Sequence, residues 1–157
     1  MSFSFGDDES AQRVQNMSYD TDNIFAKILR GEAPAHSVYE DEWSLAFMDV
    51  MPQVDGHTLV IPKDPTADLF AADPEILGRT IQTTQRVAAA VRSAFAAEGV
   101  MVAQLNGAAA GQTVFHLHFH IIPRVGGADF RLHARDMADP EVLAQHAERV
   151  RAELASA

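Results

Sequence analysis

Residues 114–122 alternate apolar side chains with histidines, and this pattern constrains the fold more than any other feature of the chain. Neighbouring side chains of a β-strand point to opposite faces, so every second residue shares a face. A strand here would direct one apolar row at a hydrophobic core: Phe115, Leu117, Phe119 and Ile121. Its other face would carry His116, His118 and His120, with successive histidines about 7 Å apart. The segment therefore predicts a sheet with one buried face and one face suited to polar chemistry.

Three histidines on one face are costly as structure alone. Each buried imidazole needs a hydrogen-bond partner, and charging all three is opposed by their mutual repulsion. Both effects lower the pKa values and keep at least one ring neutral near pH 7, the form that a nucleophile or general base requires. Two other interpretations stay open. The histidines could be satisfied structural residues, or they could bind zinc with His57 or His36 as a further ligand.

A loop of small residues precedes the histidines. It spans residues 106–113 and contains Gly107 and Gly111, which permit close backbone approach. Successive N–H groups in such a loop can bind an anion. Immediately before a histidine strand, the loop would supply the anion-binding part of a phosphoryl-transfer site.

The remaining periodic segments predict an α+β architecture. Further strands are expected at residues 37–40, 45–50, 57–61 and 100–105. Consecutive strands joined by short turns favour antiparallel pairing, and helices segregated from them favour the α+β class.

Three helices are expected from capping signals and apolar periodicity. The first spans residues 22–30, with its N-cap at Thr21 or Asp22. The second begins at the Asp73–Pro74 pair and ends at Gly99. Its expected buried stripe is Leu77, Ile81, Thr84, Ala88, Val91 and Phe95. The third begins at the Asp139–Pro140 pair, and its expected buried residues are Leu143, Ala147, Val150 and Leu154.

Composition limits the partners. The chain has 157 residues, enough for one domain with its own core, and no cysteine, which excludes disulfides and thiolate metal ligands. A net charge of −10 without a basic patch argues against nucleic acid as a partner, whereas a small anion needs only a few local donors. No apolar run approaches membrane-spanning length, and residues 1–20 lack the pattern of a signal peptide. We therefore expect a cytoplasmic protein that does not contact membranes.

The chain resembles the histidine triad (HIT) superfamily. The signature of this superfamily is three histidines separated by single apolar residues, with two further apolar residues after the last histidine. Residues 116–122 fit this signature at every position, and residues 110–124 look like the bacterial branch close to the Hint and Fhit groups. Upstream segments match family positions in the same order: 24–32, 46–50 and 56–63. The resemblance covers residues 21–131 and implies a HIT domain there. An N-terminal extension (1–20) would precede it, and a C-terminal tail and helix (132–157) would follow.

The resemblance implies a five-stranded antiparallel sheet with packed helices, and a homodimer in which two sheets join. It implies a nucleotidyl hydrolase or transferase that acts on the substituted α-phosphate of a purine nucleotide without a cofactor. His118 would attack phosphorus and form a nucleotidyl-histidine intermediate that water hydrolyses. His116 would orient this nucleophile, His120 would donate to a phosphate oxygen, and His57 would support the triad from the neighbouring strand.

A nucleotide pocket beside the triad is also implied by the resemblance. Asp49 would accept hydrogen bonds from the ribose hydroxyls, and Asn106 would contact the nucleotide. The phosphate or leaving group would contact the loop before the triad: Gly111, Gln112, Thr113 and Val114. The leaving group stays open. A nucleoside phosphoramidate such as an AMP-amine is favoured over a dinucleoside polyphosphate, and a nucleotide- or metal-binding regulator is the non-enzymatic alternative.

One departure from the family concerns metals. Many bacterial relatives carry a Cys-x-x-Cys pair at the first helix that holds structural zinc. Here Asn23 and Ala26 occupy those positions, and Trp43 stands where some relatives have another histidine. We therefore expect no structural metal. The histidines that match no family position are expected at the surface: His36, His133 and His146.

Overall fold

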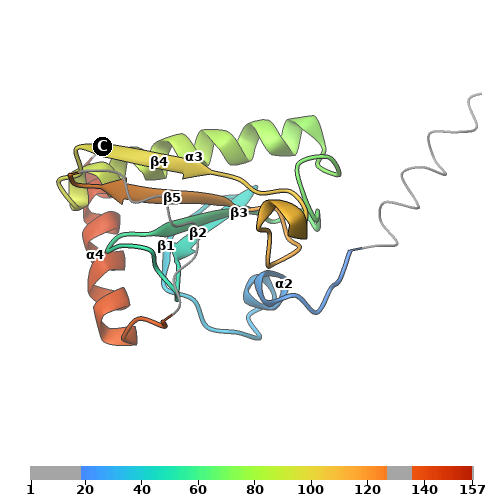
Figure 1. The fold of residues 1–157 in the computed structure, drawn as a ribbon, viewed down its shortest axis with the longest axis horizontal. Helices are drawn as coiled ribbons and strands as arrows, with labels where there is room; N and C mark the ends of the chain where they lie inside the picture. The colour runs from blue at the N-terminus through green and yellow to red at the C-terminus, as the bar shows by residue number, and fades with distance from the viewer. Residues whose placement is uncertain (1–18, 127–135, 157) are drawn as a thin grey trace, which may run out of the picture.

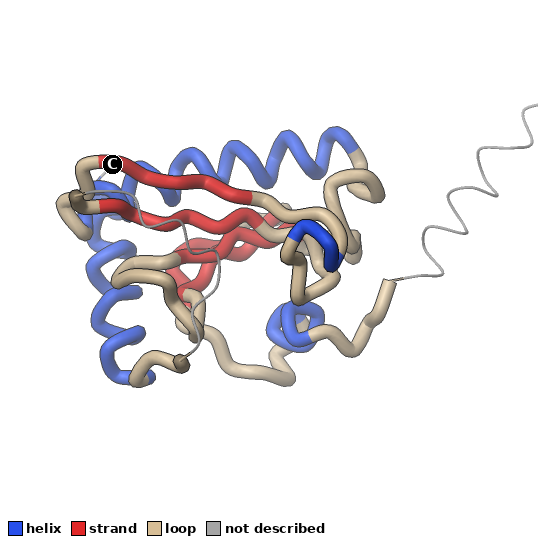
Figure 2. The backbone as a smooth tube through the Cα atoms, in the orientation of Figure 1, coloured by secondary structure: helices blue, strands red, loops and turns tan. Residues whose placement is uncertain are grey.

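The computed structural model describes residues 19–126 and 136–156, which form an antiparallel sheet with helices on both of its faces (Figures 1 and 2). The strands are β1 (Ser37–Glu40), β2 (Ser44–Met48), β3 (Thr58–Pro62), β4 (Gly99–Ala103) and β5 (Phe119–Arg124). They lie in the order β1-β2-β3-β5-β4. The helices are α2 (Ile24–Leu29), α3 (Pro74–Ala94) and α4 (Pro140–Ser156), with a 3-10 turn η1 (Ala108–Ala110). The predicted five-stranded α+β fold is confirmed.

Each face of the sheet has its own hydrophobic core. The larger core lies under α3 and α4 and includes Met48, Val60 and Ile121. The smaller core lies under α2 and includes Leu45, Phe47, Leu59 and Ile61. Side chains of β2 and β3 therefore alternate between two apolar layers, which is why every residue of these two strands is buried.

Helix α3 begins as predicted but buries a different face. The Asp73 carboxylate accepts from the backbone nitrogens of Glu75 (2.8 Å) and Ile76 (3.4 Å). The expected stripe is wrong at Ile81, which is 44% exposed, and the buried residues are Thr80, Thr83, Thr84, Val87, Ala90 and Val91. Threonine is tolerated inside because its hydroxyl can bond to a carbonyl one turn earlier, as Thr80 does with Ile76 (2.8 Å).

The ends of two helices differ from the prediction. In α2 the N-cap is Asn23, whose Oδ1 accepts from the Ala26 backbone nitrogen at 2.9 Å, and not Thr21 or Asp22. Helix α3 ends before Gly99, which is already the first residue of β4. Its last turn is closed by Phe95, and the next residue, Ala96, has a positive φ of 47°.

Helix α4 buries all four predicted residues, so its periodicity was interpreted correctly. His146 is also buried, which corrects its expected surface position. Its ring packs edge-on against Phe95 with 5.1 Å between ring centroids. His36 is partly exposed, and His133 lies outside the described residues. No helix in the described parts of the chain is long and apolar enough to cross a membrane.

Candidate active site

The triad lies where the chain enters β5, on the sheet face that α2 covers. Strand β5 begins only at Phe119, so the predicted strand over 114–122 is wrong in its first half. The backbone nitrogen of Leu117 donates to the Thr66 carbonyl (2.8 Å) instead of joining the sheet. Phe115 is 42% exposed and does not reach the core, whereas Leu117 does. His116 and His118 therefore lie in the loop just before β5, and hydrogen bonds of their side chains help to hold them in place.

His116 is fully buried, and both of its ring nitrogens have partners. Nε2 lies 2.8 Å from the Pro62 carbonyl oxygen, and because a carbonyl only accepts, Nε2 carries the proton. Nδ1 lies 2.5 Å from the Tyr19 hydroxyl, which therefore donates to it. Burial lowers the pKa of His116 to about 4, and the neighbouring His118 adds a smaller repulsive effect. The ring is therefore neutral at pH 7.

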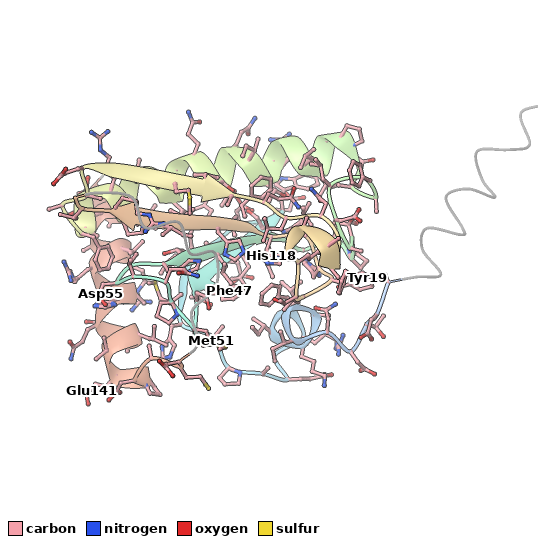
Figure 3. All side chains as sticks on the ribbon, in the orientation of Figure 1. Tyr19, Phe47, Met51, Asp55, His118 and Glu141 are labelled. Carbon is pink, nitrogen blue, oxygen red and sulfur yellow. The ribbon has the colours of Figure 1, made fainter. Side chains whose placement is uncertain are left out.

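His118 is held in one tautomer by the backbone of His116. Its Nδ1 lies 2.7 Å from the His116 carbonyl oxygen, so Nδ1 is the protonated nitrogen and the lone pair of the neutral ring is on Nε2. The rings of Phe25 and His120 meet it edge-on, at centroid distances of 5.0 and 4.9 Å. Phe25 also packs edge-on against Phe47, with 5.5 Å between ring centroids; Figure 3 labels both His118 and Phe47. These contacts fix the orientation of the imidazole.

His57 immediately precedes β3 and connects the triad to Asp49. The Gln53 backbone nitrogen donates to His57 Nδ1 (3.0 Å), which puts the proton of neutral His57 on Nε2. This Nε2 lies 2.9 Å from His120 Nδ1 and 3.4 Å from Asp49 Oδ2. His120 Nδ1 then accepts, so neutral His120 carries its proton on Nε2, the nitrogen from which it can donate to a phosphate oxygen.

The same three residues are the group among the described residues that could hold a metal ion. One ligand atom each from Asp49, His57 and His120 lies within 4.8 Å of the others. In this arrangement His57 is hydrogen-bonded to His120, and the Asp49 carboxylate lies close to the same ring nitrogen of His57. The expected lack of a metal stays a prediction. Neither Asn23 nor Ala26 offers a thiolate, and the two residues are instead joined by the N-cap hydrogen bond of α2.

The small-residue loop is braced by its own polar side chains. Gln112, which is 3% exposed, donates through Nε2 to the carbonyls of Ala67 (2.8 Å) and Val114 (3.0 Å). Its Oε1 accepts from the Gly107 nitrogen at 2.8 Å. Gly111 has a φ of +96°, the left-handed region that favours glycine. The backbone nitrogens of Gly111 and Gln112 also bond within the loop, to the carbonyls of Ala108 (3.0 Å) and Gly107 (3.1 Å). Gln112 thus shapes the loop through both its side chain and its backbone.

Asn106 connects this loop to the segment before α3. Its Oδ1 accepts from the Leu69 nitrogen (2.8 Å), and its amide exchanges two hydrogen bonds of 2.8 Å with the side chain of Gln104. Thr113 is exposed and Val114 is half-buried at the mouth of the loop. Anion binding by this loop, expected from the sequence, stays a prediction.

Two partners of the triad were missed by sequence reasoning. Tyr19 belongs to a segment that we expected to be an extension, and the Pro62 carbonyl is a backbone group that no residue pattern identifies. Phe25 lies within the helix expected at residues 22–30, but its contact with His118 was not expected. Each partner lies far from the triad in sequence, and only the tertiary fold brings it close.

Comparisons with known proteins find relatives in both sequence and fold. The HIT domain family model matches residues 30–127. Protein hit of Bacillus subtilis is 40% identical over 138 residues, 85% of this chain and 94% of that protein. Adenylylsulfatase HINT3 of Arabidopsis thaliana is 36% identical over 71% of this chain and 57% of that protein. The crystal structure of a Hit-like protein involved in cell-cycle regulation from Bartonella henselae is 48% identical, with a TM-score of 0.81 over 87% of this chain and 99% of that chain.

Proposed function

Because the chain belongs to the histidine triad (HIT) family, we propose that it is a nucleotidyl hydrolase or transferase acting on the substituted α-phosphate of a purine nucleotide. The observation that carries the proposal is the hydrogen bond from His118 Nδ1 to the His116 carbonyl. It leaves the lone pair of His118 on Nε2, which makes this nitrogen the nucleophile. Nucleoside phosphoramidates, such as an AMP-amine, are the proposed substrates.

The reaction would proceed in two displacements at phosphorus. In the first, a bond forms between His118 Nε2 and phosphorus while the bond to the leaving group breaks on the opposite side, and the amine departs with a proton taken from solvent. The positive charge that develops on the imidazole is stabilised by the His116 carbonyl, which accepts from Nδ1. His120 Nε2–H and the backbone nitrogens of Thr113 and Val114 would donate to the phosphate oxygens, since those of Gly111 and Gln112 already donate to loop carbonyls. In the second displacement, water replaces His118 and releases the nucleoside monophosphate.

A turnover comparison would identify the leaving group. Adenosine phosphoramidate, adenylylated lysine, a diadenosine polyphosphate and adenylylsulfate all carry a substituted α-phosphate. Adenylylsulfate is included because of the 36% identity to the HINT3 relative, which is named an adenylylsulfatase. We expect the highest kcat/KM with the phosphoramidates. A higher value with the polyphosphate would favour the dinucleoside polyphosphate hydrolase alternative, and nucleotide binding without turnover of any of the four would favour a regulator.

Asp49 is the proposed ribose ligand. Its Oδ1 accepts from the Met51 nitrogen (2.8 Å), and its Oδ2 faces His57 at the edge of the site, where the side chain is 15% exposed. Asp49→Asn keeps an oxygen for the Met51 nitrogen but removes the charge, so AMP binding should weaken by about 1–3 kcal/mol, measured by titration calorimetry. Binding of 2′,3′-dideoxy-AMP is the control and should be unchanged. An equal loss with both ligands would contradict the ribose assignment and indicate an effect through His57.

A homodimer is the proposed assembly. Strand β4 lies at the edge of the sheet, and exposed apolar residues occur both on it (Val102, 45%) and on α3 (Ile81, 44%). Pairing of two such edges around a two-fold axis would join the sheets and cover these side chains. We expect sedimentation at micromolar concentration to give a dimer, and Val102→Asp to give a monomer. Val125→Asp is the control, because Val125 is 68% exposed but lies beyond β5. A monomeric parent protein would refute the proposal.

A further inference from the structure

Tyr19 is the first residue that the structure describes, and it reaches the triad from a segment outside the matched family domain. It lies just before α2, 97 positions from His116, and its hydroxyl is 2.5 Å from His116 Nδ1. The two rings meet edge-on with 5.7 Å between centroids. Figure 3 labels Tyr19 at the end of the molecule where α2 and the loop before β5 lie.

The direction of this hydrogen bond follows from the other contacts of His116. The Pro62 carbonyl requires the proton on Nε2, so Nδ1 offers a lone pair and the phenol must be the donor. Burial raises the pKa of the Tyr19 phenol, which keeps its proton in place. The His116 ring is therefore clamped between one donor and one acceptor.

This clamp acts on the nucleophile through a single residue. His116 is held by its side chain, and its own carbonyl accepts the Nδ1 proton of His118 at 2.7 Å. If the His116 ring shifted, its carbonyl would move as well. His118 would then be held less firmly in its orientation, and its Nδ1–H tautomer would be less favoured. Phe25 contacts both histidine rings but makes no polar bond to them, so it cannot select a tautomer.

We infer that Tyr19 is a positioning residue for the nucleophile, which acts by donating to His116 Nδ1 and thereby holding the carbonyl that orients His118. The kinetic part of this inference rests on the proposed function. The structural part concerns the state of the His116 ring and does not depend on any substrate.

The test compares two single-atom deletions in the full chain. Tyr19→Phe removes the hydroxyl at the triad, and Tyr39→Phe, at the only other tyrosine in the chain, removes one that donates to Asp41 Oδ2 at 3.2 Å. Loss of one partly buried hydrogen bond that orients the nucleophile should lower kcat by about tenfold in Tyr19→Phe and leave KM within about twofold of the parent. Tyr39→Phe should retain the kcat of the parent.

Imidazole ¹⁵N spectra provide a readout that loss of packing would not change. In the parent and in Tyr39→Phe, His116 Nδ1 should resonate as a nitrogen that accepts a hydrogen bond. In Tyr19→Phe it should move toward the position of a nitrogen that accepts none, and the His118 resonances should show a mixture of tautomers. An unchanged His116 spectrum in Tyr19→Phe would overturn the inference, as would an equal loss of kcat in both variants. If the parent turns over no nucleotide, the proposed function fails while the spectra still decide the role of Tyr19.

Discussion

Replacing His118 with alanine is expected to lower turnover by at least about a thousandfold while nucleotide affinity changes little. The imidazole is needed only when the covalent bond to phosphorus forms, because its Nε2 lone pair is the attacking group. The ribose contact proposed for Asp49 and the phosphate contacts proposed for Thr113 and Val114 would remain. Single-turnover kinetics with adenosine phosphoramidate and calorimetry with AMP separate the two effects.

A trapped intermediate would identify the attacking residue directly. The P–N bond of a nucleotidyl-histidine is acid-labile, so the reaction is quenched rapidly in base. The parent protein with substrate should then keep one nucleotidyl group on the peptide that contains His118, detected by mass spectrometry at alkaline pH. His116 cannot take its place because one ring nitrogen donates to Pro62 and the other accepts from Tyr19. His36→Ala is the control variant and should retain parent activity. An adduct that maps to His116 or His120, or near-parent turnover by the His118 variant, would contradict the assignment.

The sequence predicted which residues form this site better than it predicted the contacts that they make. Alternation placed Leu117 and Ile121 in the core and the histidines in a polar site, because burial of an apolar row is a local property of a strand. The same rule failed at Phe115, where the backbone leaves the sheet to bond with Thr66. A hydrogen bond to a distant loop overrides periodicity, and no pattern within the segment signals it.

The roles of the ring nitrogens lie beyond sequence reasoning for a similar reason. Which nitrogen of His118 carries the proton depends on the distance to one backbone carbonyl, and for His57 it depends on the Gln53 backbone nitrogen. The family resemblance implied a separate role for each of these histidines. It did not assign their tautomers, and it did not include Tyr19, which lies before the matched region. The chemistry of a side chain follows from its residue type, whereas the orientation of the side chain follows from the fold.

Among the glycines of the chain, we expect Gly56 to be the one where substitution by alanine lowers the free energy of unfolding most. Its φ is +88°, and a Cβ there would lie 2.6 Å from Cδ2 of the Phe95 ring. The ring has little room to move, because the Arg149 guanidinium lies 4.4 Å from its centroid and His146 packs on its edge. The backbone strain and the overlap together should lower the free energy of unfolding by about 3 kcal/mol in Gly56→Ala.

A double-mutant cycle in urea separates the overlap from the backbone strain. Phe95→Ala alone removes a partly buried ring and should also destabilise the protein, but it opens the space that the new Cβ requires. The double variant should therefore lose about 1–2 kcal/mol less free energy of unfolding than the two single variants lose together. The loss that Gly56→Ala still causes in the Phe95→Ala background then measures the cost of the positive φ. Gly78→Ala is the matched control, since Gly78 lies inside α3 with nothing within 4 Å of its added Cβ, and it should be neutral or stabilising. Additive changes in the cycle would show that Phe95 does not restrict Gly56. Because His57 follows Gly56 and bonds to His120, Gly56→Ala should also lower kcat under conditions where it is fully folded.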